Sequence, residues 1–269
     1  MKNLSVPVEN LRKDIRMRQE SDPIMSTAWL LVYLIPIFAV IITVITVFYV
    51  VLAAMAEPWI APEEPWPALP LLAGSIILLV LLAIIAFIVF IILTYKLVRR
   101  RNTHFKRQMF LSEDVVTTVK TMAAKKGVGV EVDLSSVERT IREAKAEETE
   151  KGAVLWAILT AVPYIGFLAQ WYVYYFLMKD FYQHERREDG FWEDLSRTLD
   201  KVGITFSVPR RTEATPNRSF VLYLILTIIT VGLFGIYWLY VLLKDPNEHF
   251  KYHVQVEDQL LSTLESVAI

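Results

Sequence analysis

A frame of about thirty residues recurs three times along this chain, each time where an apolar segment ends. The copies align without a gap. Each opens with a tyrosine. A basic residue follows four residues after the tyrosine, a histidine nine residues after it and a second base eleven residues after it. The tyrosines and histidines are Tyr95 and His104, Tyr175 and His184, and Tyr240 and His249. Because internal repeats are the signature of architectures built from equivalent units, we expect three related structural units.

The composition is typical of an integral membrane protein. Apolar residues make up 54% of the 269 residues, and the mean hydropathy is +0.39. Residues 27–56 and 68–95 carry no charged side chain, and each run exceeds the roughly 20 residues that a helix needs to cross a bilayer. Two further uncharged runs cover residues 153–178 and 219–243. The absence of cysteine excludes disulfides, thiolate metal sites, cysteine-ligated iron–sulfur clusters and cysteine nucleophiles.

Charge is distributed unevenly between the segments that flank these runs. Residues 96–126 contain nine lysines and arginines and two acids, whereas residues 57–67 contain three glutamates and no base. By the positive-inside rule, residues 57–67 are outside and the long basic segment is cytoplasmic. The first 26 residues are too long and too mixed in charge for a cleavable leader, so the first run is a signal anchor. We therefore expect a multi-pass protein of the cell membrane with both termini in the cytoplasm.

The two later apolar runs are each broken at their centre by residues at which a backbone turns. These are Pro163 and Gly166 in one run and Gly232 and Gly235 in the other. As single spans, the runs would put the second and third frames on opposite sides of the membrane, although equivalent units should face equivalent solvent. We therefore predict two short re-entrant helical hairpins, which pack against the long spans or against another subunit. A single kinked span is the alternative.

The last apolar run resembles a known family. Residues 227–245 read T-I-I-T-V-G-L-F-G-I-Y-W-L-Y-V-L-L-K-D and are followed closely by Asn247. This is similar to a widespread family of small prokaryotic integral-membrane domains of unknown function, which share a T-x-G-x-x-G-I-Y-W-x-Y hairpin core. Residues 160–180 resemble the core more loosely, with Pro163 and Gly166 in place of its glycines. Because the family has no assigned activity, the resemblance implies the hairpin and no particular chemistry.

The residues after each frame show two periodicities. Apolar positions at helical spacing predict three amphipathic helices. They are Val115, Val116, Val119, Met122 and Ala123, then Leu195, Leu199 and Val202, then Leu260, Leu261, Leu264, Val267 and Ala268. Alternating apolar residues at 128–134 and 204–208 predict short strands, and residues 4–8 offer a third. A further helix is expected from Ser135 to Glu150.

We therefore expect a mainly α integral membrane protein of three hairpin–helix(–strand) repeats. It would have two long transmembrane helices, two short re-entrant helical hairpins and small cytoplasmic α/β elements. The expected segments are a cytoplasmic N-terminal part at 1–26, a first repeat at 27–134, a second at 135–208 and a third at 209–269.

Three histidines in one register raise the question of a metal site, since zinc accepts three imidazoles and a water. His249 and His253 are also four residues apart, which is a ligand spacing on one helix face. On the other hand, a histidine near a helix C-terminus is explained by the last carbonyls and the helix dipole. Residues 99–101 are arginines that would repel a dication beside His104. We therefore expect no metal and no cofactor.

Basic residues in and near the frames predict contact with anionic lipid headgroups, each base contributing about 1 kcal/mol near a charged leaflet. Positive-inside anchoring also explains them. They are Arg99, Arg100, Arg101, Lys106, Lys179, Arg186, Lys244 and Lys251.

No enzyme motif is present in the sequence: there is no P-loop, no G-x-S-x-G turn and no dinucleotide-binding glycine pattern. We expect a structural or accessory membrane protein that acts through oligomerisation or as a subunit of a larger membrane complex. Its partners would be membrane lipids and protein subunits, and not nucleic acid. The alternative is a channel or transporter built from re-entrant hairpins, although the apolar runs contain no charged residue. A more distant alternative is an interfacial lipid enzyme with Asp180–His184 and Asp245–His249 as acid–base pairs.

The charge asymmetry makes a testable prediction about topology. Single cysteines replacing Glu63, Thr140, Thr212 and Ala268 are probed on intact cells with a membrane-impermeant maleimide. Only Glu63→Cys should be labelled, because only residues 57–67 are expected outside. Labelling of Thr212→Cys from outside would contradict the hairpin at 153–178 and favour a single span.

Overall fold

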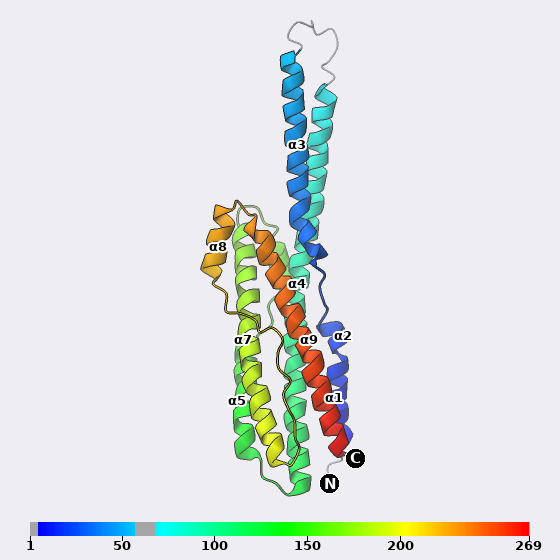
Figure 1. The fold of residues 1–269 in the computed structure, drawn as a ribbon, viewed down its shortest axis with the longest axis vertical. Coiled ribbons are helices and arrows are strands. Elements are labelled where there is room, and N and C mark those ends of the chain that lie inside the picture. The colour runs from blue at the N-terminus through cyan, green and yellow to red at the C-terminus, as the bar shows by residue number, and fades with distance from the viewer. Residues whose placement is uncertain (1–4, 57–67, 269) are drawn as a thin grey trace.

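The computed structural model describes residues 5–56 and 68–268, and every regular element within these ranges is a helix. The mainly helical class predicted from the sequence is therefore confirmed. Figure 1 shows an elongated molecule in which a long helical hairpin projects from a bundle of helices. The projecting hairpin consists of α3 (Leu31–Ala56), preceded by the 3-10 turn η1 (Thr27–Leu30), and of the first half of α4 (Ala68–Lys126).

The two helices of the projecting hairpin are long and apolar enough to cross a membrane. Only 11% of the most apolar window of each is buried within the molecule, so most of their side chains face outward. Ile45 and Phe48 on α3 and Val80 and Ile84 on α4 are examples of large exposed side chains. An apolar surface of this extent is stable against lipid chains rather than against water. The loop at 57–67, predicted to be outside the cell, lies outside the described residues.

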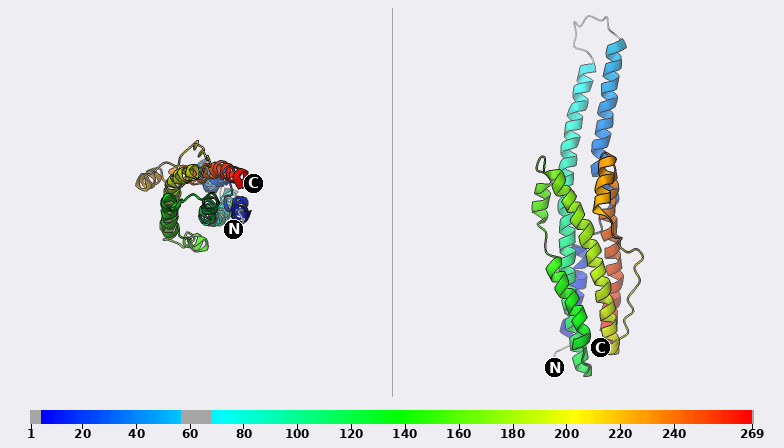
Figure 2. Two further views of the ribbon diagram at one scale, coloured as in Figure 1. Left: turned by 90° about the horizontal axis from the view of Figure 1, so that it is seen from below. Right: turned by 90° about the vertical axis from the view of Figure 1, so that its left-hand side faces the viewer.

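The helix α4 continues without interruption from the projecting hairpin into the bundle. Its 59 residues correspond to about 90 Å of helix at 1.5 Å per residue. The other long helices lie along its second half (Figures 1 and 2). They are α1 (Ser5–Arg16), α5 (Glu131–Glu147), α7 (Gly166–Lys201) and α9 (Phe234–Ala268), with the one-turn helix α2 (Arg18–Ser21) after α1. One helix thus carries both a membrane-length segment and a wall of the bundle.

The apolar faces predicted after each frame form the core of the bundle. The residues twenty and twenty-four positions after the frame tyrosine are fully buried in all three long helices. These are Val115 and Val119 of α4, Leu195 and Leu199 of α7, and Leu260 and Leu264 of α9.

The predicted strands are wrong for the described part of the chain. Residues 131–134 form the first turn of α5, and residues 204–208 run without a partner strand. Val130 and Leu134 are four residues apart, so the alternating pattern also buries one face of a helix. The acids Glu131 and Asp133 in the first turn favour that helix through its dipole. Of the third proposed strand, residues 5–8 begin α1, and Leu4 lies outside the described residues. The small α/β elements therefore do not form.

Two short helices turn back into long ones at the end of the bundle nearest the projecting hairpin (Figure 1). α6 (Ala153–Leu159) leads into α7, and α8 (Phe220–Ile229) leads into α9. Both turns fall where the sequence has its glycine and proline breaks. Gly232 has a φ of 88°, which favours glycine, whereas Gly235 is already helical. Because α6 ends at Leu159, residues 153–178 are not one continuous helix.

The first of these turns should tolerate no side chain at Gly166. A Cβ there would lie 2.4 Å from the carbonyl oxygen of Thr160, a backbone atom with no freedom to move aside. We expect Gly166→Ala to lower stability by about 1–3 kcal/mol. In the same helix, a Cβ at Gly190 meets nothing within 4 Å, so Gly190→Ala should stabilise by about 0.5–1 kcal/mol. Thermal unfolding in detergent measures both, and equal melting temperatures would contradict the tight turn.

Candidate metal centre

The three frame histidines come together between α4, α7 and α9. His104, His184 and His249 are 0%, 3% and 2% exposed, and each helix continues for several turns beyond its histidine. None of them is close enough to a helix C-terminus to bond its last carbonyls. The explanation of these histidines by helix ends, on which the expectation of no metal partly rested, therefore does not apply.

The inner ring nitrogens face a common point, together with two residues one helical turn further along. Nε2 of His249 lies 3.1 Å from Nε2 of His104 and 3.0 Å from Nε2 of His253. Glu188 places one oxygen 2.9 Å from Nε2 of His253 and the other 3.1 Å from Nε2 of His184. One donor atom from each of these five residues lies within 4.8 Å of all the others. Donors bound at right angles to one ion at about 2.1 Å are about 3 Å apart, so this spacing fits one metal ion.

The outer nitrogen of every imidazole faces a carboxylate. The Nδ1–oxygen distances are 3.0 Å for His104–Asp22, 2.9 Å for His184–Glu148, 3.2 Å for His249–Glu185 and 2.8 Å for His253–Glu257. At His104 and His184, a carboxylate that accepts the Nδ1 proton fixes the tautomer whose Nε2 lone pair points inward, as is usual for metal-bound histidine. Nδ1 of His249 and of His253 also lies beside a donor, Nη1 of Arg211 at 3.3 Å and the amide of Gln108. Inward lone pairs about 3 Å apart repel each other unless a proton or a cation lies between them.

The centre has more negative than positive charge when its histidines are neutral. Five carboxylates contact the imidazoles, and three guanidinium groups, those of Arg107, Arg187 and Arg211, pair with these carboxylates at 3.4 Å or less. Arg18 also lies 3.6 Å from Glu257, so the five carboxylates outnumber the four guanidinium groups by one, and buried charge has to be compensated. Bound protons or a metal ion would supply the compensation.

When no ion is bound, the pKa values of the four histidines diverge. Burial lowers the pKa of His104 to about 3 and also lowers that of His249. Burial acts on His184 as well, but Glu148 and Glu188 outweigh it and raise the pKa to about 10. The pKa of His253 is raised in the same way, against burial, by Glu188 and Glu257. The carboxylates thus favour protonation of His184 and His253, burial disfavours it at His104 and His249, and a metal ion would compete with the bound protons.

Three of the five donors occupy a common register in the sequence, and His253 is marked by its spacing from His249, whereas Glu188 is not among the predicted residues. A regularity in the sequence could have indicated it: the residue four positions after each frame histidine is polar. These residues are Gln108, Glu188 and His253, and all three are buried at the centre. Asp22 and Glu148 come from segments outside the frames, and no periodicity in the sequence marks them. They are visible only once the chain is folded.

Two of the eight bases predicted to contact lipid are buried. Arg100 is 2% exposed, lies over the ring of Phe250 and donates to Oδ1 of Asn247 at 2.6 Å. Arg101 is 1% exposed and pairs with Asp180 at 2.9 Å. Of these two arginines, Arg101 is paired with a carboxylate, whereas Arg100 has a neutral amide and an aromatic ring as its partners. Of the remaining six, Arg99, Lys106, Arg186 and Lys251 are exposed, and Lys179 and Lys244 are half-buried.

The predicted acid–base pairs do not form. Asp180 is held by Arg101 and Asp245 by Arg218, and within the described part of the chain neither carboxylate bonds a histidine. The frame tyrosines lie on the hairpin side of the centre, where Tyr95 and Tyr240 are half-buried and Tyr175 is exposed. The chemical groups that the three frames bring together are therefore the histidines and the residues one turn beyond them.

The fold and the site define a helical protein with two helices of membrane length and a buried histidine–carboxylate cluster. Residues 218–265 match a family model described as a domain of unknown function, DUF4234. This agrees with the resemblance of residues 227–247 to a family of unknown function. The matched segment contains α8 and most of α9, and with them His249, His253 and Glu257. No curated protein and no solved structure matches the chain.

Arg107 should be essential for the stability of this centre. It is 1% exposed and donates to Asp22 at 2.7 Å and to Glu257 at 2.9 Å. Its removal in Arg107→Ala leaves two buried carboxylates short of a partner, which should cost about 3–5 kcal/mol. Arg139, whose side chain is 70% exposed and 3.7 Å from Glu143, is the control and should lose at most about 1 kcal/mol on change to alanine. Similar melting temperatures of the two variants would contradict the paired arrangement.

Proposed function

We propose that this protein is a membrane-anchored metal-binding protein with a structural or accessory role, whose buried centre takes one divalent transition-metal ion. One observation carries the proposal. Four Nε2 atoms and one carboxylate oxygen converge on a single point, and each of the four imidazoles has a carboxylate on its outer nitrogen. The Nε2 atoms of His104, His249 and His253 lie 3.0 and 3.1 Å apart at its centre, a spacing that a shared proton or a metal ion between the nitrogens would stabilise.

The donor set indicates the kind of ion. Calcium and magnesium prefer oxygen ligands, whereas imidazole suits the later first-row ions, including divalent iron, cobalt, nickel and zinc. The chain supplies no thiolate that would favour copper(I) or a closed cysteine site. The excess of carboxylates over guanidinium groups at the centre supports a bound cation.

The position of the centre supports a structural or accessory role. An ion bound there links α4, α7 and α9 through their own side chains. Through the Asp22–His104 contact it also holds the N-terminal segment that leads into α3. Because the donors are brought together only in the folded bundle, the free energy of metal binding adds to the stability of the fold.

The same proposal sets the projecting hairpin across the cell membrane and the bundle, with both termini, in the cytoplasm. Large exposed apolar side chains near the two turns support entry of the short hairpins into the cytoplasmic leaflet, among them Ile158, Phe167, Ile228 and Leu233. Arg99 and the other exposed bases would face anionic headgroups. The uncovered apolar surface of α3 leaves room for association with a second copy or with a larger membrane complex.

Metal content tests the proposal. The protein is purified without a histidine tag, and metals are measured by inductively coupled plasma mass spectrometry. We expect about one first-row divalent ion per chain. His184→Ala and His249→Ala should lose it, and Glu148→Gln should weaken binding by about 10–100-fold. Glu193→Gln, whose parent side chain is 73% exposed on the same helix as His184, is the control and should keep the ion.

Two results would contradict the proposal. One is folded protein, checked by circular dichroism, that binds no transition metal even after incubation with cobalt or zinc. The other is equal metal content in the histidine variants and in Glu193→Gln.

A further inference from the structure

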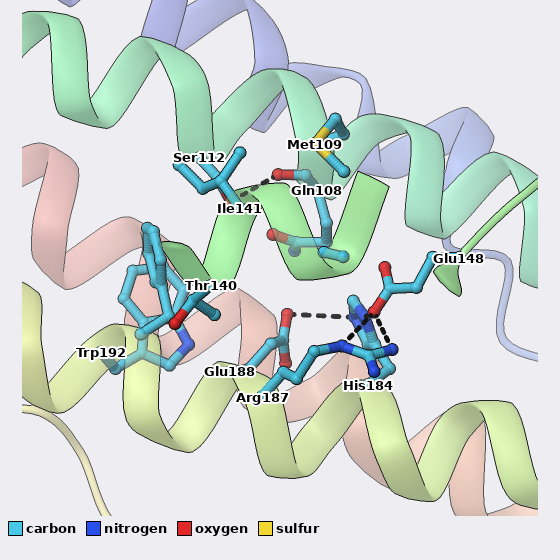
Figure 3. A pocket seen from close by; sticks show the side chains of 12 residues that line it. Gln108, Met109, Ser112, Thr140, Ile141, Glu148, His184, Arg187, Glu188 and Trp192 are labelled. Atoms are coloured by element: carbon cyan, nitrogen blue, oxygen red, sulfur yellow. Dashed lines mark hydrogen bonds and ion pairs between the residues drawn. The ribbon is translucent and has the colours of Figure 1, made fainter. Parts of the chain in front are cut away.

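A small cavity, partly open to solvent, adjoins the candidate metal centre. It lies between α4, α5 and α7, and its volume is about 30 Å³. Figure 3 shows the side chains of Gln108, Thr140, Glu188 and Trp192 arranged around it. Two of the five donor residues, His184 and Glu188, also line its wall, so the cavity and the metal position are immediate neighbours.

The cavity wall contains a hydrogen-bond donor without an acceptor. Trp192 is 1% exposed, and its indole Nε1 has no hydrogen-bond partner among the described residues. Nε2 of His184, in the same wall, also lacks a hydrogen bond of acceptable geometry. Buried polar groups are nearly always satisfied, so an unpaired N–H beside a cavity indicates a small ligand that accepts a hydrogen bond.

One of the six frame positions at the centre holds no donor to the common point. Three helices each bring two frame positions to the centre, the histidine and the residue four further on, which makes six. Five of the six hold a donor to the common point, and six is the number that an octahedral ion takes. The exception is Gln108, whose amide donates instead to Glu257 at 2.6 Å. Gln108 is also one of the residues that line the cavity.

We propose that this cavity holds the sixth ligand of the metal ion, a water molecule that exchanges for an inorganic ligand of two or three atoms. The inference rests on the proposed function, because it requires the ion. The volume admits about two water-sized groups, which suits a small inorganic ligand such as dioxygen or azide. One end of the ligand would bind the ion, and the other would accept the hydrogen bond of Trp192. The site thus makes the centre open to small-molecule chemistry.

Azide binding to the cobalt-loaded protein tests the site, because the visible spectrum of cobalt(II) reports a change of ligand. We expect saturable spectral changes on titration with sodium azide. Ala144 lines the cavity from α5, and Ala144→Leu should fill it, keep the cobalt and weaken the azide response at least tenfold. Ala146→Leu, at an exposed position on the same helix, should behave like the unaltered protein. Trp192→Phe keeps the aromatic ring and removes the donor, so azide should bind about three- to tenfold more weakly.

The outcomes separate the two proposals. Stoichiometric cobalt with no azide response would overturn the ligand site and leave the metal centre standing. Equal azide affinity in Ala144→Leu and Ala146→Leu would also overturn the ligand site, because azide would then bind elsewhere. Failure of the unaltered, folded protein to bind cobalt would overturn the proposed function and the ligand site together.

Discussion

The structure depends on one buried layer of ionisable side chains, in which negative and positive charges have to balance. Along α4, α7 and α9, an apolar core towards the projecting hairpin, with Leu97, Leu177 and Leu242, is separated from a second core, with Leu111, Leu195 and Leu260. Between the two cores lie four histidines and the carboxylates and guanidinium groups that contact them. Because unpaired buried charge is costly, this layer fixes the helix register. A slip of one residue would replace His104 by Phe105 or His249 by Phe250 and leave the carboxylates unpaired.

The layer also determines how the membrane segment and the bundle are connected. His104 follows Tyr95 by nine residues of continuous helix, so the centre lies about 14 Å beyond the end of the apolar run. The N-terminal segment reaches the same layer through Asp22 and then enters α3. Both helices of the projecting hairpin are therefore tied to the centre, one directly and one through a short segment. Binding or loss of the proposed ion would therefore act on both helices at the base of the projecting hairpin.

The sequence predicts which segments are helical better than it predicts where the helices begin and end. It also predicts the common register of the three histidines better than the full set of residues at the centre. Apolar periodicity located the buried faces of α4, α7 and α9, and the repeated frame put three histidines in equivalent places. The strand at 128–134 was misread because Val130 and Leu134 satisfy both periodicities at once. Arg100 and Arg101 were assigned to the surface because composition does not show that Asn247 and Asp180 lie opposite them. Asp22 and Glu148 were missed because their contacts with the histidines are long-range in sequence.

The differences between the frames are as informative as their agreement. If all three frames had a histidine or a carboxylate four residues after the first histidine, six donors would converge and the ion would be fully enclosed by protein. Glu188 and His253 follow that pattern, whereas Gln108 departs from it and bonds Glu257. Its neutral amide is a poorer ligand for a late first-row ion than imidazole or carboxylate. The departure occurs on the side of α4 that lines the cavity with Trp192, so the one incomplete frame and an unpaired indole N–H adjoin the same space.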